Sequence, residues 1–522
     1  MKQILTLLFA FISLLTVQAQ QLRNPVIPGF HPDPSVCRVG SDYYLVNSSF
    51  QYFPGVPIFH SKDLVSWKQI GNVLDRESQL PLSGATSWLG IYAPTIRYHE
   101  GTYYMITTNV GKQGNFLVTA SNPAGPWSEP LWLEQGGIDP SLFFEDGKTY
   151  MVSNPDNTIT LCEIDPTTGK RLTDSKPLWQ GTGGRWPEGP HIYKKDGWYY
   201  LLISEGGTEL AHRLTIARSR NIYGPYEANP ANPLLTNCSM AGQTMQIQGT
   251  GHGDFVQAHD GSWWLVFLAY RNYGGSYHHL GRETCLAPVE WGEGAWPVVN
   301  GGQPIDTLMT VPSLLNAAAV APVVEEKTDF RQPLGPGWLY IQNPVKANYR
   351  QHDGRLTLTA SDGTLTDNEQ PTFVGRRQQH ARFIAETEIS AVAGTGGLTV
   401  YQINDGHADF CLSEQGEIAV TLRLKSVAAD IYRMPIRLTS DRRVVMRVES
   451  DGEKYYFSYR FANDSRSHAA GSIECSLLST EVAGGFTGVV LGMYADSGRL
   501  TFDRFEYKEN PLYRLSSQTS AQ

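Results

Sequence analysis

The sequence predicts an all-β protein, in which a five-bladed β-propeller is followed by a jelly-roll β-sandwich. Two observations favour this fold class. One pattern, a strand, a charged turn with glycine and an aromatic strand, recurs five times in the first 300 residues. Beyond them, strands alternate apolar and polar residues, as half-buried antiparallel strands do. Little of the chain has the spacing of a helix, and 51 Gly and 31 Pro suit turn-rich β structure.

Residues 1–19 are predicted to be a secretory signal peptide. An apolar run from Ile4 to Val17 follows a single lysine, and Ala19 ends a small-residue cleavage site. The run is too short to span a bilayer, and no cysteine follows the site directly. We therefore expect an exported, periplasmic protein without a membrane anchor.

The five copies of the repeat define the predicted blades, which lie within a propeller domain at residues 20–305. Three copies open with a carboxylate beside Pro or Gly, and two lack an acid there. Their anchor residues are 45 to 64 positions apart, which fits a four-stranded blade with loops of variable length. The copies are HPDPSVCRVGSDYYLV from His31, APTIRYHEGTYYMIT from Ala93, GIDPSLFFEDGKTYMV from Gly137, PEGPHIYKKDGWYYLL from Pro187 and GHGDFVQAHDGSWWLVF from Gly251.

When these copies are aligned, one position is occupied by Asp33, Asp139 and Glu188. The first strand of each blade lines the central axis, so these acids should face one another in one pocket. Glycoside hydrolysis needs one carboxylic acid and one carboxylate with pKa values pushed apart, and a third acid can assist. Taken singly, Asp-Pro and Glu-Gly pairs more often initiate turns, but three at equivalent positions favour a catalytic site.

Composition excludes some partners. A net charge of −9 and a pI near 5.8 argue against nucleic acid or an anionic membrane surface. Aromatic residues make up 11% and suit sugar-stacking surfaces, although most will fill strand interiors. The six cysteines lack zinc spacing and are expected to be buried thiols, with a Cys238–Cys285 bridge left open.

The second half of the chain is divided by composition. A Pro-, Ala- and Val-rich passage predicts a connector at residues 306–327. Alternating strands then predict the sandwich at 328–513, and the Ser- and Gln-rich residues 514–522 predict a disordered tail.

Several motifs together resemble glycoside hydrolase family 43, in the group of β-xylosidases and α-L-arabinofuranosidases with a C-terminal sandwich. The motifs are NPVIPGFHPDPS at Asn24, YFPGVPIFHSKDLVSW at Tyr52, IDPSLF at Ile138, EGPHIY at Glu188 and LGRET at Leu280. The resemblance implies an inverting reaction with Asp33 as general base, Glu188 as general acid and Asp139 as modulator of the acid's pKa and orientation. The two catalytic carboxyls should then lie roughly 6.5–9.5 Å apart to admit a water.

The resemblance also implies substrate-binding residues. Arg282 matches an arginine that contacts substrate hydroxyls near the base. Phe50 matches a family aromatic, whereas Tyr92 stands where xylosidase relatives often carry Trp, which favours arabinofuranose over xylopyranose. Trp186 could complete this apolar wall or simply pack.

Two further residues are candidates through the resemblance. His252 stands where some family members place a histidine against a central water or calcium ion, although a lone histidine is more often a core residue. No organic cofactor is expected, and a structural calcium near the axis is left open. Phe373, in the segment 367–380, would be an aromatic that the sandwich sends toward the catalytic funnel; an ordinary exposed hairpin is the alternative.

We therefore expect an exo-acting α-L-arabinofuranosidase that removes terminal arabinofuranose from side chains of plant hemicellulose or pectin oligosaccharides. A β-D-xylosidase or an enzyme with both activities is the first alternative. A non-catalytic sugar-binding propeller is the second, although it would not need three acids. A retaining fructan hydrolase is disfavoured because its N-D-P-N and R-D-P motifs are absent.

Overall fold

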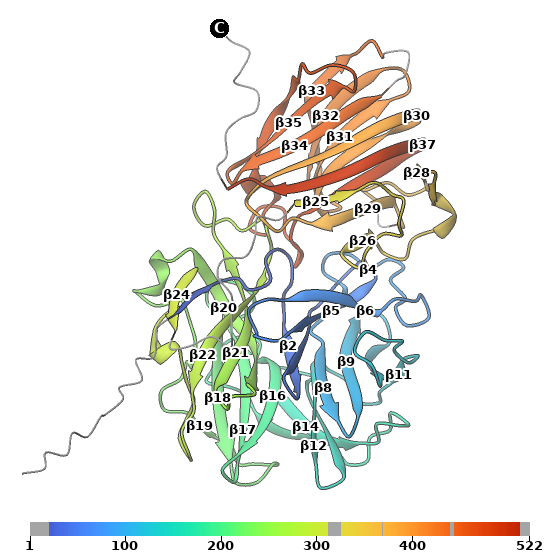
Figure 1. The fold of residues 1–522 in the computed structure, drawn as a ribbon. Helices are drawn as coiled ribbons and strands as arrows, with labels where there is room; N and C mark the ends of the chain where they lie inside the picture. Colours follow the sequence, from blue (N-terminus) through green and yellow to red (C-terminus); the bar gives the residue numbers. More distant parts are fainter. Residues whose placement is uncertain (1–19, 312–324, 368, 439–442, 512–522) are drawn as a thin grey trace, which may run out of the picture.

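A computed structural model describes residues 20–311, 325–367, 369–438 and 443–511, and it is nearly all β-structure (Figure 1). The predicted signal peptide, tail and most of the connector lie outside the described residues. Among the described residues, helix is limited to four short 3-10 turns, namely η1 (Gly242–Thr244), η2 (Asn300–Gly302), η3 (Lys346–Asn348) and η4 (Cys475–Leu478).

The propeller has the five blades that the repeat predicts, each built from consecutive antiparallel strands. Blade 1 contains β2 (Ser35–Val39), β3 (Asp42–Val46), β5 (Gly55–Ser61) and β6 (Lys68–Leu74). Blade 2 contains β8 (Thr95–His99), β9 (Thr102–Val110), β10 (Gly114–Ala120) and β11 (Leu131–Trp132), with β7 (Gly90–Ile91) also on β9. Blade 3 contains β12 (Ile138–Glu145), β13 (Lys148–Asn154), β14 (Ile159–Ile164) and β15 (Lys176–Trp179). Blade 4 contains β16 (Glu188–Lys195), β17 (Trp198–Glu205), β18 (Arg213–Ser219) and β19 (Glu227–Ala228). Blade 5 contains β20 (Ile247–Gln257), β21 (Trp263–Arg271), β22 (Glu283–Glu290) and β23 (Val298–Val299).

The ring is closed by chain segments outside the blades. The N-terminal strand β1 (Gln20–Arg23) pairs with β24 (Leu308–Val311), which follows blade 5. Asn24 then exchanges two hydrogen bonds of 2.9 Å with the backbone of Leu286 on β22. These contacts tie the start of the propeller to its last blade.

A buried ion pair joins blades near the axis. Asp254 of β20 is fully buried and accepts hydrogen bonds from Arg97 of β8 at 2.7 Å and from Tyr193 of β16 at 2.6 Å. Ser35 of β2 donates to the same carboxylate at 2.7 Å. Four blades therefore share one charge, whose full pairing offsets its burial.

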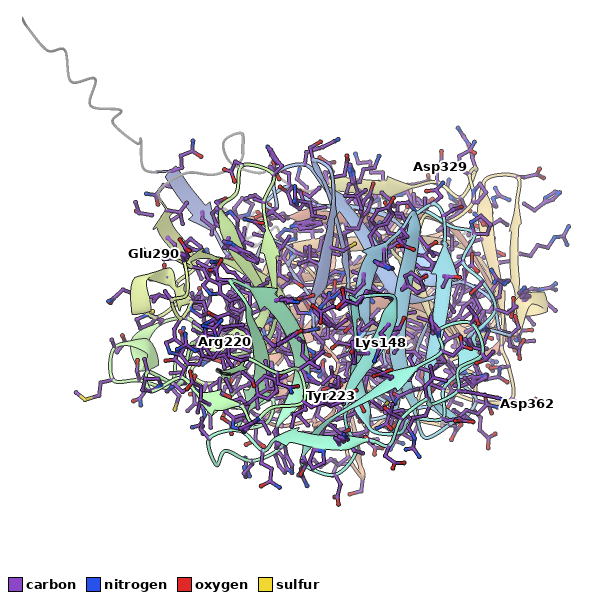
Figure 2. All side chains as sticks on the ribbon, turned by 90° about the horizontal axis from the view of Figure 1, so that it is seen from below. Lys148, Arg220, Tyr223, Glu290, Asp329 and Asp362 are labelled. Atoms are coloured by element: carbon purple, nitrogen blue, oxygen red, sulfur yellow. The ribbon has the colours of Figure 1, made fainter. Side chains whose placement is uncertain are left out.

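Neighbouring blades are also joined nearer the rim. Lys148 of blade 3 donates to Glu163 at 2.8 Å, and Tyr223, in the connection after β18, donates to the same carboxylate at 3.0 Å. Lys148 and Tyr223 are labelled in the view from below (Figure 2).

The sandwich is organised by two long strands, β30 (Arg382–Ile403) and β37 (Val490–Glu509), which pair with each other over most of their length. Because β30 and β37 run through both layers, the other strands of each layer are joined to one or both of them, directly or through a neighbouring strand. One layer adds β31 (Gly406–Ser413), β32 (Glu417–Leu424), β33 (Val427–Pro435), β29 (Thr372–Arg377) and β26 (Trp338–Ile341). The other adds β34 (Val444–Asp451), β35 (Lys454–Phe461), β36 (His468–Glu474), β25 (Glu325–Thr328), β28 (Arg355–Thr359) and β27 (Tyr349–His352).

The sandwich lies directly on one end of the propeller (Figure 1). Strand β4 (Tyr52–Phe53) leaves blade 1 and pairs with β26 of the sandwich. At the domain boundaries, β24 belongs to the propeller through β1, and β25 belongs to the sandwich through β37. The two ends of the predicted connector are therefore parts of the two domains.

All six cysteines lie among the described residues. All six cysteines are free, so Cys238 and Cys285 form no bridge, but the expectation of buried thiols is wrong for Cys238, which is exposed, and Cys411 is only partly buried. No helix among the residues described is long and apolar enough to cross a membrane.

Candidate active site

Asp33 and Asp139 occupy equivalent positions at the start of the first strands of blades 1 and 3. Each precedes a proline, and each has a left-handed backbone with φ of 52°. Such a conformation is strained for a residue other than glycine and is typical of functional sites. The two carboxyls lie close enough to interact electrostatically.

The expectation that Glu188 occupies this same repeat position is wrong by one residue. Glu188 pairs with Ser204 of the next strand as Ile138 pairs with Asn154 in blade 3. Gly189, with φ of 58°, therefore stands where Asp139 does. The register is displaced because blade 4 uses a glycine in the left-handed position and carries its acid on the preceding residue.

The acids nevertheless converge. The backbone N–H of Gly189 donates to Oδ2 of Asp139 at 3.1 Å, which fixes Asp139 beside the Glu188 backbone. Burial, together with the negative charges of Glu188 and Asp33, raises the pKa of Asp139 well above its usual range. Three carboxyls from three blades therefore form one electrostatically coupled group, as the sequence predicts.

Asp33 is held in its ionised form. Its Oδ1 accepts a hydrogen bond from Arg282 at 3.0 Å, its Oδ2 accepts one from the Ser48 hydroxyl, and His252 lies 3.9 Å away. Burial alone would raise the pKa of Asp33, but Arg282, then His252 and Ser48, outweigh it and hold the pKa below its ordinary value.

Glu188 has a different environment. Its side chain is 15% exposed, and Oε1 lies 3.3 Å from Nε2 of His212, which is completely buried. His212 also contacts the carbonyl of Gly249 through Nδ1 at 3.3 Å. Sequence reasoning missed His212 because it lies in the connection between β17 and β18, outside any motif.

Arg282 joins the acids to the sandwich. Beyond its bond to Asp33, its Nη2 donates to the backbone carbonyl of Phe486 at 3.3 Å. Its guanidinium lies 5.6 Å from the ring centroids of both Phe50 and Phe486. Arg282 is therefore fixed between the two domains, beside Asp33.

Phe50, which is 2% exposed, and Tyr92 pack into an aromatic wall with ring centroids 5.3 Å apart; that this wall binds a sugar stays a prediction. Two unpredicted rings complete it. Phe486 lies 5.7 Å from Phe50 and 6.1 Å from Tyr92, and Trp88, 47% exposed, lies 4.7 Å from Phe486. The wall thus contains one aromatic side chain from the sandwich.

The prediction that Phe373 reaches into the funnel is wrong. Residues 372–377 form strand β29, and the Phe373 side chain is 0% exposed, packed against Gly492 of β37. It lies in the hydrophobic cluster that contains Phe50 and Tyr52. Phe373 therefore supports the wall from behind, and Phe486 is the sandwich residue that reaches Arg282.

Trp186 lies two residues before Glu188 and is 49% exposed. The guanidinium of Arg185 lies 4.4 Å from its ring centroid, and a Cβ on Gly207 would lie 2.6 Å from the indole, so the ring packs closely against this glycine. The indole is thus partly packed and partly exposed, and the hypothesis that it stacks a sugar stays a prediction.

The hypothesis of a calcium ion at His252 stays a prediction. In the described part of the chain, no group of three or more His, Cys, Asp or Glu is arranged to hold a metal ion. His252 has left-handed backbone and packs against Gly189, and the nearby Asp33 oxygen already accepts a bond from Arg282. The guanidinium charge there disfavours a second cation, so these residues fit calcium poorly.

Paired acids with a charged partner at the end of a propeller axis, under an aromatic wall, define a glycoside hydrolase. The family model described as Glycosyl hydrolases family 43 matches residues 22–297, and the model described as Beta xylosidase C-terminal Concanavalin A-like domain matches residues 327–508. The chain therefore belongs to glycosyl hydrolase family 43 and is a glycosidase.

Curated relatives match over nearly their whole length. The chain is 38% identical to the "Non-reducing end alpha-L-arabinofuranosidase BoGH43B" of Bacteroides ovatus, covering 97% of this chain and 98% of that protein. It is 39% identical to a "Xylosidase/arabinosidase" of Butyrivibrio fibrisolvens, covering 92% and 97%. The solved structure titled "Bacteroides ovatus Xyloglucan PUL GH43B" superposes with a TM-score of 0.88 at 40% identity, covering 94% of this chain and 100% of that one.

Proposed function

We propose that this glycosidase is an exo-acting, inverting α-L-arabinofuranosidase that releases terminal arabinofuranose from side chains of plant hemicellulose or pectin oligosaccharides. The observation that carries the proposal is the contrast between two carboxyls of one site. Asp33 accepts a hydrogen bond from Arg282, which helps to hold its pKa low, whereas Glu188 faces the His212 ring and the carboxyl of Asp139, whose pKa is raised by burial and by the Glu188 charge.

The proposed reaction gives each acid of the site a role. A water gives its proton to Asp33 as its oxygen attacks the anomeric carbon, and the glycosidic C–O bond breaks on the opposite face. Glu188 gives its proton to the departing oxygen, so the leaving group departs as an alcohol. Asp139 orients the acid through the Gly189 backbone, and Arg282 holds a sugar hydroxyl beside Asp33.

The preference for arabinofuranose rests on two supports. The relative with an arabinofuranosidase name matches along 97% of this chain, and its structure has "Xyloglucan", a plant hemicellulose, in its title. Tyr92 stands in the wall where the resemblance leads one to expect Trp in xylosidases. Exo action is supported by Phe486, which closes one side of the wall from the other domain.

A β-D-xylosidase, or an enzyme with both activities, is the second candidate. It is favoured by the name of the Butyrivibrio relative, which includes both sugars, and by Trp88, which returns an indole to the wall near Tyr92. The export signal is part of the proposal: with residues 1–19 removed, the enzyme would act in the periplasm. We propose no organic cofactor.

Product analysis tests the proposal. Incubation with arabinose-substituted oligosaccharides should release free arabinose as the only small product, and NMR should show the inverted anomer first. Release of xylose from the chain end would replace the proposal with the second candidate. A retained anomer would contradict Asp33 as general base, and oligosaccharides as first products would contradict exo action.

A further inference from the structure

Glu481, on the sandwich loop that carries Phe486, makes a two-point contact with the propeller. Its Oε1 lies 2.5 Å from Nδ1 of His278, and its Oε2 accepts a hydrogen bond of 3.1 Å from the His278 backbone N–H. Both carboxylate oxygens therefore bind one residue, which fixes the loop in direction as well as in distance.

His278 is itself held firmly. Its side chain is buried, and its ring stacks on Tyr270 of β21 with centroids 4.0 Å apart and planes within 15°. His278 lies four residues before Arg282, on the short segment that leads into β22. His278, which Glu481 binds, is therefore joined to Arg282 by a short stretch of backbone.

The backbones of the two segments meet along the same line. Val489 N–H donates to the His279 carbonyl at 3.0 Å, and the N–H of Thr480 approaches the His278 carbonyl at 3.5 Å. A Cβ on Gly488 would lie 2.2 Å from the carbonyl oxygen of Leu280, so only glycine permits this approach. The loop 479–489 therefore lies directly against the segment 278–282.

The other end of this contact reaches the site. The Phe486 N–H donates to the Ser87 carbonyl at 3.1 Å, the Phe486 carbonyl accepts from Arg282, and its ring completes the wall. Displacement of the loop would therefore change the aromatic wall and the direction of the Arg282 guanidinium together.

We propose that Glu481 is a positioning residue for the reaction, which clasps His278 so that Phe486 and Arg282 take the places that sugar binding requires. Glu481 contacts none of the three acids and acts through Phe486 and Arg282. The proposal rests on the proposed function for its kinetic test, but the clasp itself has a structural test.

The kinetic test compares Glu481→Ala with Glu481→Gln on the glycoside that the wild type prefers. The alanine variant should raise KM about tenfold, with kcat within about threefold, because the wall and Arg282 bind the sugar ring. Glutamine keeps an oxygen for the His278 N–H and should restore most of the affinity. The KM effect should be smaller in a Phe486→Ala background, since both changes act on one wall.

Gln69→Ala is the matched control. The Gln69 side chain donates to the Pro336 carbonyl at 2.9 Å, so this substitution removes a hydrogen bond between the domains at a different place. It should leave KM unchanged. An equal rise of KM in Gln69→Ala, or no rise in a folded Glu481→Ala enzyme, would overturn the positioning role.

Hydrogen exchange measured by mass spectrometry tests the clasp without activity. Glu481→Ala should speed exchange in peptides covering 277–282 and 479–489 and leave the remaining blades unchanged. If the wild type cleaves neither an α-L-arabinofuranoside nor a β-D-xyloside, the proposed function fails, and hydrogen exchange alone then tests whether Glu481 holds the two segments together. Unchanged exchange in both peptides would refute the clasp.

Discussion

Arg282 of blade 5 lies 3.0 Å from the Asp33 carboxylate of blade 1, although 249 residues separate them in the chain. The same guanidinium donates to the Phe486 carbonyl of the sandwich. One side chain thus determines the charge of the proposed base and contacts the second domain, so its removal should have an electrostatic effect that can be measured.

Replacing Arg282 by Met should shift the acid limb of the pH profile. Asp33 must be ionised to accept the proton of water, so activity is present above its pKa and is lost as the pH falls through it. Arg282 holds that pKa low. Loss of the cation should therefore move the acid limb of kcat/KM to higher pH by about one unit, and Arg282→Lys should move it less. An acid limb that stays in place would contradict the electrostatic role.

Glu188→Gln should reduce kcat by about 10²–10⁴-fold on substrates with poor leaving groups, since the acid's proton is then missing. Aryl glycosides with strongly acidic phenols need less protonation and should lose much less. The measurement is kcat against the pKa of the leaving phenol in wild type and variant. Equal losses along the series would show that Glu188 does not protonate the leaving group.

Asp254→Asn should destabilise the propeller, although the residue does not contact the substrate. The substitution would leave the partly buried Arg97 without its carboxylate, at a cost of about 3–5 kcal/mol in the free energy of unfolding at pH 7. Chemical unfolding followed by near-UV circular dichroism measures this. Asp42→Asn, which breaks a partly exposed pair with Lys62, is the control and should cost less than about 1 kcal/mol.

The pH dependence of the same pair has a definite sign. The pKa of Asp254 is lowered in the fold, because Arg97 and then His191 outweigh the effect of burial. Its stabilisation is therefore complete above the unfolded-state pKa of about 3.9 and is lost as the pH falls toward the folded-state pKa. The stability difference between wild type and Asp254→Asn should shrink in acid; a constant difference would contradict the ion pair.

Trp186→Ala should affect the leaving-group side of the substrate only. An exposed indole beside Glu188 can stack the next sugar, which is worth about 1 kcal/mol, so KM for branched oligosaccharides should rise about fivefold. The inhibition constant of free arabinose should not change. Phe50→Ala, in the wall, should weaken inhibition by arabinose instead. If both variants change the KM and the inhibition constant in the same way, Trp186 and Phe50 do not bind different sugars of the substrate.

The blades and the meeting of three acids were predictable because both follow from a repeat. Equivalent strands of a propeller line one axis, so Asp33 and Asp139 had to point to one end of it. The one-residue offset of Glu188 was not predictable by the same means. It depends on which residue takes the left-handed backbone, and Gly189 does so in blade 4.

The contribution of the sandwich was harder to predict. The family resemblance makes Phe373 the candidate for an aromatic that the sandwich sends toward the site, but its segment pairs with β37 and its side chain is fully buried. Phe486 lies between glycines in a sequence without a motif, and its role arises only from contacts with Ser87 and Arg282 in the other domain. Contacts between domains leave no periodic pattern in the sequence.

The most direct test of the account is a comparison of initial rates on the 4-nitrophenyl glycosides of α-L-arabinofuranose and β-D-xylopyranose, for wild type and Glu188→Ala. We predict a clear preference of the wild type for the arabinofuranoside and a large loss of its hydrolysis in the variant. Preference for the xyloside, activity on neither substrate, or an unaffected variant would contradict it.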